Sequence, residues 1–379
     1  MVYRRTHIQS VLPVVLFAAL AFTLLISQAG TASAQEPGEQ GLTVIESDQS
    51  FEETWAALAE ALQANENIQV LGQIDHASAA SIAGLDLDPN RVVFFGNPAL
   101  GTPLMEASRS AALDLPQKIQ VYEVDGTAYV AYNSADYLGA RHAAADIDTL
   151  PTIAGALANF SAAGTGLESA IVADATSIMA GEGVDTKISE NTFEQTWDNL
   201  VGAIESSPAN LAFTVDHGEN SGGALRPTRL AIFGNPAIGT PLMNDNPTIG
   251  IDLPLKIVVW EDFKGNTKVS STDPSFLANR HNIGGATDSL SAAATALNNF
   301  VAAATAADDN GASGGDSGTD DSAGADDGSA AGGDGDDDDK KADLPQTGRS
   351  AAPILIGAFL LMAGGIFLLT GDRLEMTEG

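Results

Sequence analysis

The sequence predicts the α+β class, with two copies of one domain that each combine an antiparallel sheet and helices in the order β-α-β-β-β-β-α. The first observation is an internal repeat: FGNPALGTPLM at residues 95–105 recurs as FGNPAIGTPLM at 233–243. The second is a pair of apolar stretches around Asp125-Gly126, the pattern of a β-hairpin with a tight turn. The third is the helical spacing of apolar residues near both ends of each copy. A signal peptide, a disordered acidic stalk and a C-terminal transmembrane helix complete the prediction.

The internal repeat covers whole domains. Phe51 and Phe193 lie 142 positions apart, whereas the two Asn-Pro stretches lie 138 apart, so the offset changes only slightly and does so in loops. This pattern is typical of a tandem duplication. We expect a first repeat at 35–166 with its core at 42–143, a linker at 167–183, and a second repeat at 184–307 with its core at 184–282. We also expect the two repeats to pack as an intramolecular pseudo-dimer.

The first half of each copy is predicted to contain a strand, a helix and two further strands. Residues 42–46 form a short strand, and Ser50 and Glu53 have the spacing of a capping box, which recurs in the second copy. Apolar side chains at helical spacing follow, and they predict one buried helix face. Alternating residues predict a strand at 68–76, and the nearly all-apolar stretch at 91–96 predicts a central strand.

The second half is predicted to contain a hairpin and two helices. Strands at 118–124 and 127–132 flank the hairpin turn. One helix begins at Ser134 and ends near Arg141, and an alanine-rich helix follows it. Before the hairpin, the Gly-Asn-Pro-x-x-Gly-Thr-Pro stretch is interpreted as a turn, because glycine allows positive φ, asparagine bonds its own backbone and proline fixes φ.

The N-terminus resembles a secretory signal peptide at residues 1–34. Arg4 and Arg5 precede an apolar run at 11–27, and the small residues at 32–34 match a cleavage pattern. We therefore expect an exported chain whose mature form begins near Gln35.

The region after the second repeat has the features of a surface anchor. Residues 308–343 consist almost entirely of Asp, Gly, Ser and Ala, which cannot build a core, so we expect a disordered stalk. The LPQTG motif at 344–348 resembles the LPxTG sorting signal of Gram-positive surface proteins. That resemblance implies that a sortase cleaves between Thr347 and Gly348 and joins the chain to the cell wall.

The last segment is apolar and is followed by a short tail. Residues 351–370 are long enough to cross a bilayer as a transmembrane helix. The tail at 371–379 has a single basic residue, Arg373, whereas sorting-signal tails are usually basic. An uncleaved span in the cell membrane is therefore the alternative to attachment at the wall. Both arrangements place the repeats on the extracellular face.

Composition excludes several functions. The net charge is −33 and the isoelectric point is near 4.1, so the chain lacks the Lys and Arg clusters that neutralise phosphates, and nucleic acid is not expected as a partner. There is no cysteine, which excludes disulfides, thiolate metal sites and cysteine nucleophiles.

Several repeated motifs together resemble a known family. They are Asp-His after the second strand, Phe-Gly-Asn-Pro-x-x-Gly-Thr-Pro-Leu-Met, a Leu/Ile-Asp-Leu-Pro-x-Lys-Ile stretch and a closing Arg-His. In both copies these motifs are similar to those of domain-of-unknown-function family number 302, over roughly 42–143 and 184–282. The resemblance implies a fold like that of the TATA-binding protein, and it implies no activity.

The candidate site residues are the repeated histidines and the polar residues near them. The candidate ligand-binding set is His76, Asn97, Lys118, His142, His217, Asn235, Lys256 and His281. Two histidines and a carboxylate in each copy also suit a divalent metal ion, with the candidate ligands His76, Glu123, His142, His217, Glu261 and His281. The alternative is that each histidine closes an apolar strand face and bonds the backbone.

We predict a surface protein that binds a small ligand or a metal ion without transforming it, and we assign no catalytic residue. The sequence contains no Gly-x-Ser-x-Gly nucleophile elbow, no His-Glu-x-x-His zinc-binding helix and no glycine pattern of a dinucleotide-binding fold. Two alternatives remain open: a hydrolase-like enzyme that uses the Asp-His pairs, and a purely structural surface stalk.

Overall fold

The computed structural model describes residues 40–167, 171–172, 175, 177–307 and 366–367. The predicted signal peptide, the stalk, the LPQTG motif and the tail lie outside the described residues. So does the apolar segment 351–370, apart from Ile366–Phe367, which form the short strand β12. Within the described ranges, none of the helices combines the length and the hydropathy needed to cross a membrane.

Each repeat contains a five-stranded antiparallel sheet, which confirms the predicted α+β class with two copies of one domain. The first sheet has the order β2-β3-β4-β5-β1, with the short strands β12 and β6 at its edges, and the second has the order β8-β9-β10-β11-β7. The strands of the first sheet are β1 (Leu42–Glu46), β2 (Gln69–Asp75), β3 (Asn90–Gly96), β4 (Gln117–Val124), β5 (Thr127–Asn133) and β6 (Ile171–Val172). Those of the second are β7 (Val184–Ile188), β8 (Asn210–Asp216), β9 (Thr228–Gly234), β10 (Leu255–Glu261) and β11 (Thr267–Thr272).

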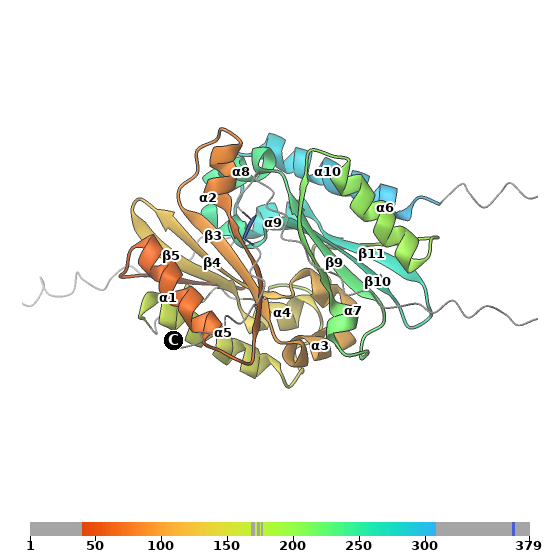
Figure 1. The fold of residues 1–379 in the computed structure, drawn as a ribbon, viewed down its shortest axis with the longest axis horizontal. Helices are drawn as coiled ribbons and strands as arrows, with labels where there is room; N and C mark the ends of the chain where they lie inside the picture. Colours follow the sequence, from red (N-terminus) through yellow and green to blue (C-terminus); the bar gives the residue numbers. More distant parts are fainter. Residues whose placement is uncertain (1–39, 168–170, 173–174, 176, 308–365, 368–379) are drawn as a thin grey trace, which may run out of the picture.

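Helices occupy equivalent positions in the two repeats. The first repeat has α1 (Phe51–Gln63), α2 (His76–Ile82), α3 (Pro98–Ala107), the 3-10 helix η1 (Arg109–Leu113), α4 (Ala135–Arg141) and α5 (Leu150–Thr165). The second has α6 (Phe193–Glu205), α7 (His217–Asn220), α8 (Pro236–Asp245), η2 (Pro247–Ile251), α9 (Pro274–Arg280) and α10 (Thr287–Thr305). Figure 1 shows α1 and α5 outside one sheet and α6 and α10 outside the other, so the uncovered faces of the two sheets point toward each other.

Local sequence explains the start of the long helix in each repeat. The hydroxyl of Ser50 accepts a hydrogen bond from the backbone N–H of Glu53, and the Glu53 carboxylate accepts one from the backbone N–H of Ser50. Thr192 and Gln195 repeat this capping box in α6. The predicted capping boxes are thus present, and they satisfy backbone donors that the first helical turn leaves free.

The Gly-Asn-Pro stretch, expected to be a turn, instead begins a ten-residue helix. Asn97 is the N-cap of α3, where its side-chain oxygen accepts from the N–H of Ala99, and Pro98 occupies the first helical position. Both residue types favour those positions, because asparagine satisfies a free N–H and proline has none to satisfy. The interpretation as a turn was wrong because asparagine and proline also suit the start of a helix, and burial of Thr102 and the residues after Pro103 stabilises that helix.

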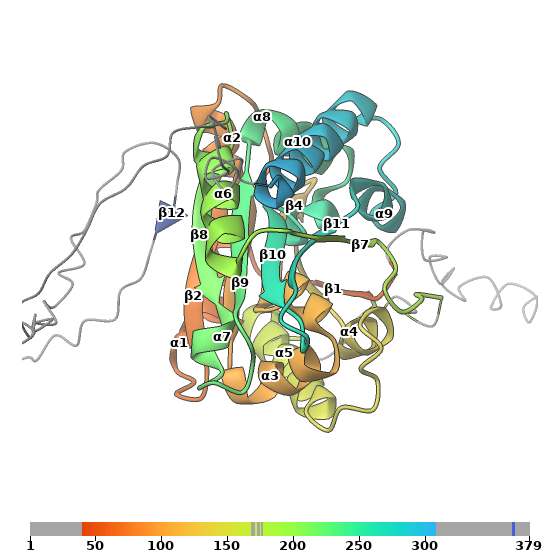
Figure 2. The same cartoon turned by 90° about the vertical axis from the view of Figure 1, so that its right-hand side faces the viewer.

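The two repeats pack reciprocally. Helix α2 of the first repeat contacts α8 of the second, and α7 of the second contacts α3 of the first. The ring of Phe94 in β3 meets the ring of Phe213 in β8 edge to face, with centroids 5.1 Å apart. The views of Figures 1 and 2 show these elements meeting where the two repeats adjoin. The interface therefore contains two equivalent helix pairs, α2 with α8 and α7 with α3. In each pair one repeat contributes the short helix and the other contributes the helix capped by asparagine.

Candidate functional site

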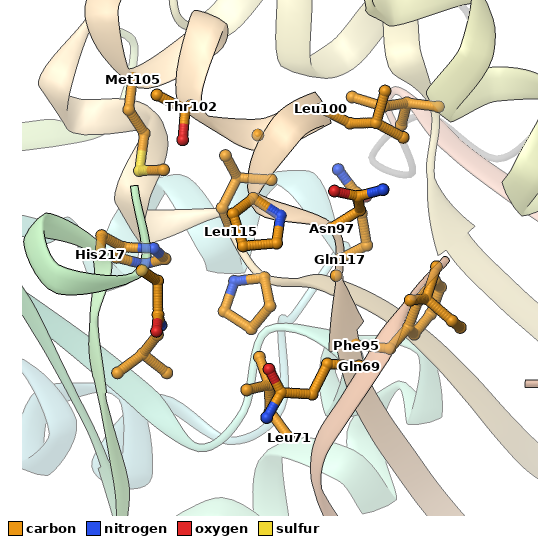
Figure 3. Close-up of a pocket in the computed structure, with 18 of the residues that line it drawn as sticks. Gln69, Leu71, Phe95, Asn97, Leu100, Thr102, Met105, Leu115, Gln117 and His217 are labelled. Atoms are coloured by element: carbon orange, nitrogen blue, oxygen red, sulfur yellow. The ribbon is translucent and has the colours of Figure 1, made fainter. Parts of the chain in front are cut away.

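Two cavities lie where the repeats meet, and each takes walls from both. In the first cavity, Asn97, Thr102 and Gln117 of the first repeat face His217 of the second (Figure 3). In the second cavity, Asn235 and Thr240 of the second repeat face His76 of the first. The Asp-His motif of one repeat thus meets the Gly-Asn-Pro-x-x-Gly-Thr-Pro motif of the other.

The helix that begins at each asparagine carries a threonine into the same cavity. Thr102 and Thr240 lie one turn after the first helical residue, with 8% and 2% of their surfaces exposed. Among the described residues the Thr240 hydroxyl has no hydrogen-bond partner. Buried hydroxyls are usually paired, so this unpaired oxygen at the wall of the second cavity is an exception.

Both cavity histidines are buried and neutral near pH 7. Each begins a short helix and is 6% exposed. Burial lowers the pKa of His76 to about 4, although a hydrogen bond of 3.1 Å to the carbonyl of Gly250 in the other repeat opposes that shift. Burial likewise lowers the pKa of His217 to about 4, although the nearby backbone carbonyl of Leu115 opposes that shift. The Nε2 atom of His217 has no hydrogen-bond partner in the described part of the chain.

The aspartate before each cavity histidine accepts hydrogen bonds from a backbone N–H and from an arginine, not from the histidine. Asp75 accepts from the N–H of Ser78, which caps α2, and from Arg91 Nε at 2.7 Å. Asp216 repeats both contacts with Glu219 and Arg229. These carboxylates are therefore not placed to orient the neighbouring imidazoles as the base of a hydrolase.

A second group of motif residues forms a buried ion cluster between the repeats. In the first repeat, Asp114 accepts from Arg141 at 2.6 Å and from His142 Nε2 at 2.7 Å. In the second, Asp252 accepts from Arg280 at 2.6 Å and from His281 Nε2 at 2.9 Å. Burial alone would raise the pKa of each carboxyl, but the arginine charge, the Lys118 charge and the histidine hydrogen bond outweigh it, so both pKa values are lowered.

The two arginines also join the repeats. Arg141 donates to the carbonyls of Glu182 and Gly183 and to the Thr272 hydroxyl of the second repeat. Its guanidinium lies 4.7 Å from the ring centroid of Phe276.

The second repeat returns the same contacts. Arg280 donates to the carbonyl of Gln40 and the side-chain oxygen of Asn133, and it lies 4.0 Å from the Tyr137 ring centroid. Each closing arginine thus holds the segment before the first strand of the opposite repeat.

Lys118 and Lys256 occupy equivalent positions in the two repeats but make different contacts in the cluster. The ammonium of Lys118 lies 3.3 Å from an Asp252 oxygen and 3.9 Å from an Asp114 oxygen, between the two carboxylates. Lys256 instead donates to the backbone carbonyls of Asp252 and Pro254. Burial and the nearby Lys118 charge lower the pKa of Lys256 well below its usual range. Only one ammonium occupies the position between the carboxylates.

We therefore expect methionine to be tolerated very differently at the two lysines. Lys118→Met should lower the free energy of unfolding by about 2 kcal/mol, because hydrogen bonds to charged groups contribute roughly 1.5–3 kcal/mol. Lys256→Met should stay within about 1 kcal/mol of the wild type, because the lost bonds to carbonyls are offset by removal of a buried amine whose charged form burial disfavours. Urea denaturation at pH 7 measures both. Equal effects would contradict the asymmetric assignment.

One chain of hydrogen bonds has the residue types of a serine-hydrolase triad. Ser110 lies 3.0 Å from His142 Nδ1, and His142 Nε2 contacts Asp114. Arg141 and Lys118 already engage that carboxylate, which leaves it less able to stabilise a protonated imidazole. The corresponding chain in the second repeat runs from Thr248, which is 2% exposed, so it has no accessible nucleophile.

The structure therefore divides the eight predicted ligand-binding residues between two kinds of site. The cavity residues are His76, Asn97, His217 and Asn235, and the ion-cluster residues are Lys118, His142, Lys256 and His281. The histidines of one repeat lie in different sites, and Glu261 pairs with Arg226. In the described residues, no three His, Asp or Glu side chains are grouped so that they could hold a metal ion.

Sequence reasoning missed two pairs of site residues. Thr102 and Thr240 were interpreted only as turn residues, and Asp114 and Asp252 were not proposed as the centre of a cluster. The available signal was their retention in both copies, inside the Gly-Thr-Pro and Asp-Leu-Pro motifs.

Comparison with known proteins gives a family and a few relatives. A sequence profile described as "Domain of unknown function DUF302" matches residues 43–160 and 185–304. Two curated relatives are named fluoride-specific ion channel FluC 1, from Brucella suis biovar 1 and Brucella abortus biovar 1. Each is 39% identical over 109 residues, which is 28% of this chain and 43% or 40% of the relative. The chain thus spans about two fifths of the length of these relatives. A crystal structure of an uncharacterized conserved DUF302 protein from Bacillus stearothermophilus aligns at 18% identity and a TM-score of 0.30, over 32% of this chain and 98% of its own.

Proposed function

Because this chain belongs to the DUF302 family, with one family domain in each repeat, we propose that it is a binding protein. It holds small ligands in its two composite cavities and does not transform them. The observation that carries this proposal is that two motifs of opposite repeats converge on each cavity. Each cavity thus combines a neutral imidazole, an amide and a hydroxyl.

The lining of the cavities has the chemistry of a ligand site. Both walls are mainly apolar, and a few polar groups converge on each. Small-molecule sites are usually built in this way, with apolar walls for affinity and a few polar groups for orientation. The unpaired Nε2 of His217 and hydroxyl of Thr240 are groups that a ligand would satisfy.

We further propose that the protein works on the outer face of the cell. The support is in the sequence: a signal-like N-terminus, an acidic stalk at 308–343, the LPQTG motif and the apolar segment 351–370. In this arrangement the stalk carries the two repeats away from the wall or the membrane, where they meet solutes from the surroundings.

Binding of uncharged fragments tests the proposal. Indole and benzamide each combine an apolar ring with a hydrogen-bonding group, and we expect saturable binding to the full chain with dissociation constants on the order of 0.1–1 mM. The double variant His76→Leu/His217→Leu should bind at least about fivefold more weakly, because one orienting hydrogen bond contributes roughly 1 kcal/mol. Ligand-detected NMR gives both constants.

A matched control separates the cavities from exposed surface. Phe263→Ser removes a ring that is 81% exposed, and this variant should bind as the wild type does. Fragments that do not saturate the wild type, or that bind the folded histidine double variant equally well, would refute the proposal. The second outcome, with a lowered melting temperature, would leave the histidines a structural role.

The Ser110–His142–Asp114 chain supports one alternative, a hydrolase. Under that alternative, a fluorophosphonate reagent would label Ser110, and Ser110→Ala would abolish ester hydrolysis while fragment binding survived. Under the binding proposal, the reagent leaves Ser110 unlabelled at concentrations that label a serine hydrolase fully.

A further inference from the structure

The two cavities differ greatly in size although they are built from equivalent elements. The first encloses about 80 Å³, and the second about 540 Å³. The larger volume lies in the range of sites that hold drug-sized molecules, whereas the smaller one has room for a few waters or a very small solute.

Side-chain size explains the difference. Five residues before the cavity histidine on β2 and β8, Leu71 lines the first cavity where Ala212 lines the second. Seven residues before the last helical phenylalanine, Ile153 lines the first where Ala293 lines the second. Alanine in place of a branched side chain leaves open space at both positions, and the surrounding helices and strands keep the same arrangement.

Residue types differ at two further equivalent positions. Gln117 and Asn220 line the first cavity, where the second has Leu255 and Ala79. The Gln117 amide nitrogen is buried and has no partner in the described residues. The second cavity is lined by no charged side chain, and its polar groups include Thr240 and the neutral His76.

We propose that the duplicated sites have diverged in ligand class. The second cavity binds an uncharged, largely apolar molecule with one hydrogen-bonding group, of the size of a fused-ring aromatic compound or a medium-length acyl chain. The first cavity is restricted to small solutes because its volume is far smaller. This inference rests on the proposed binding function and names the ligand class of each site. Charge is excluded from the ligand of the second cavity because no ion pair there would repay the loss of its hydration.

Nile red, an uncharged fluorescent dye of fused rings, tests the assignment on the full chain. We expect one saturable site with enhanced fluorescence. Ala293→Ile gives the second cavity the residue that Ile153 provides in the first. Ala212→Leu does the same on the other wall, where the first cavity has Leu71. Each change should weaken binding at least about tenfold, because it fills the space the dye occupies. The two variants act independently, so one that fails to fold leaves the other to decide.

The matched control changes the first cavity instead. Gln117→Leu gives that cavity the residue found in the second, and the dye affinity of this variant should equal that of the wild type. Dye held by the apolar segment 351–370 would be unaffected by all of these changes, so unchanged binding in both folded filling variants would overturn the inference.

Indole and benzamide distinguish a failure of this inference from a failure of the proposed binding function. If they bind in a histidine-dependent way while Nile red shows no saturable site, the ligand class assigned to the second cavity is wrong and the binding function stands. If neither fragments nor dye bind, both are wrong.

Discussion

Replacing Arg141 with methionine is expected to lower the free energy of unfolding by about 3–5 kcal/mol, the usual cost of removing one partner from a buried ion pair. Both partners are almost fully enclosed: the side chains of Arg141 and Asp114 are each 1% exposed. Without the guanidinium, Asp114 keeps its charge in a buried site with His142 and the more distant Lys118. The variant also loses the donors to Glu182 and Gly183, which tie the two repeats together. Urea denaturation at pH 7 measures the loss.

Arg280→Met should behave in the same way, because Arg280 makes the equivalent contacts to Asp252 and to the first repeat. Arg226→Met is the control: its ion pair with Glu261 is at the surface, where Arg226 is 48% exposed. Exposed pairs contribute roughly 0–1 kcal/mol. If all three variants lost the same stability, the buried cluster would not be what holds the repeats together.

Acidification from pH 7 to pH 4 is expected to destabilise the protein by about 3 kcal/mol for each cavity histidine, since one pKa unit corresponds to about 1.4 kcal/mol. Burial lowers the pKa of His76 and of His217 from 6.5 to about 4. The unfolded chain therefore binds protons below pH 6.5, whereas the folded protein does not until about pH 4. Their contribution is complete above pH 6.5, falls as the pH is lowered and levels off below about 4.

The glutamine variants isolate this effect from the many surface carboxylates. His76→Gln and His217→Gln should each reduce the slope of unfolding free energy against pH by about 1.4 kcal/mol per unit between pH 6 and 4.5. The buried carboxyls Asp114 and Asp252 have lowered pKa values, so their contribution is lost only below the ordinary aspartate pKa of about 3.9. A slope that the glutamine variants leave unchanged would show that the histidines are charged or accessible.

The sequence predicted the elements whose causes are local. The capping boxes at Ser50 and Thr192 need residues only three positions away, and the Asp125-Gly126 turn needs only its own backbone, so both were confirmed. The start of the helix after Asn97 also has a local cause, but asparagine followed by proline is equally typical of a turn, and it was interpreted as one. Its stability comes from tertiary burial, which spacing alone does not show.

The candidate residues remain a prediction, and the structure groups them differently from the sequence analysis. His76 was grouped with His142 because both lie in the first repeat, yet its cavity partner Asn235 lies 159 positions later, in the second. The sequence alone does not show that each cavity takes residues from both repeats. Likewise Lys118 and Lys256 are equivalent in the motif, and only the geometry of the cluster shows that a single ammonium fits between the two carboxylates.

Because each cavity takes residues from both repeats, a chain with one copy of this domain would hold half of each cavity: the imidazole of one and the capped helix of the other. Two such chains would have to associate face to face to complete a cavity, and any substitution would then appear in both cavities of the pair. In the duplicated chain each cavity can change alone, because Ala293 occurs in one copy and Ile153 at the equivalent position of the other.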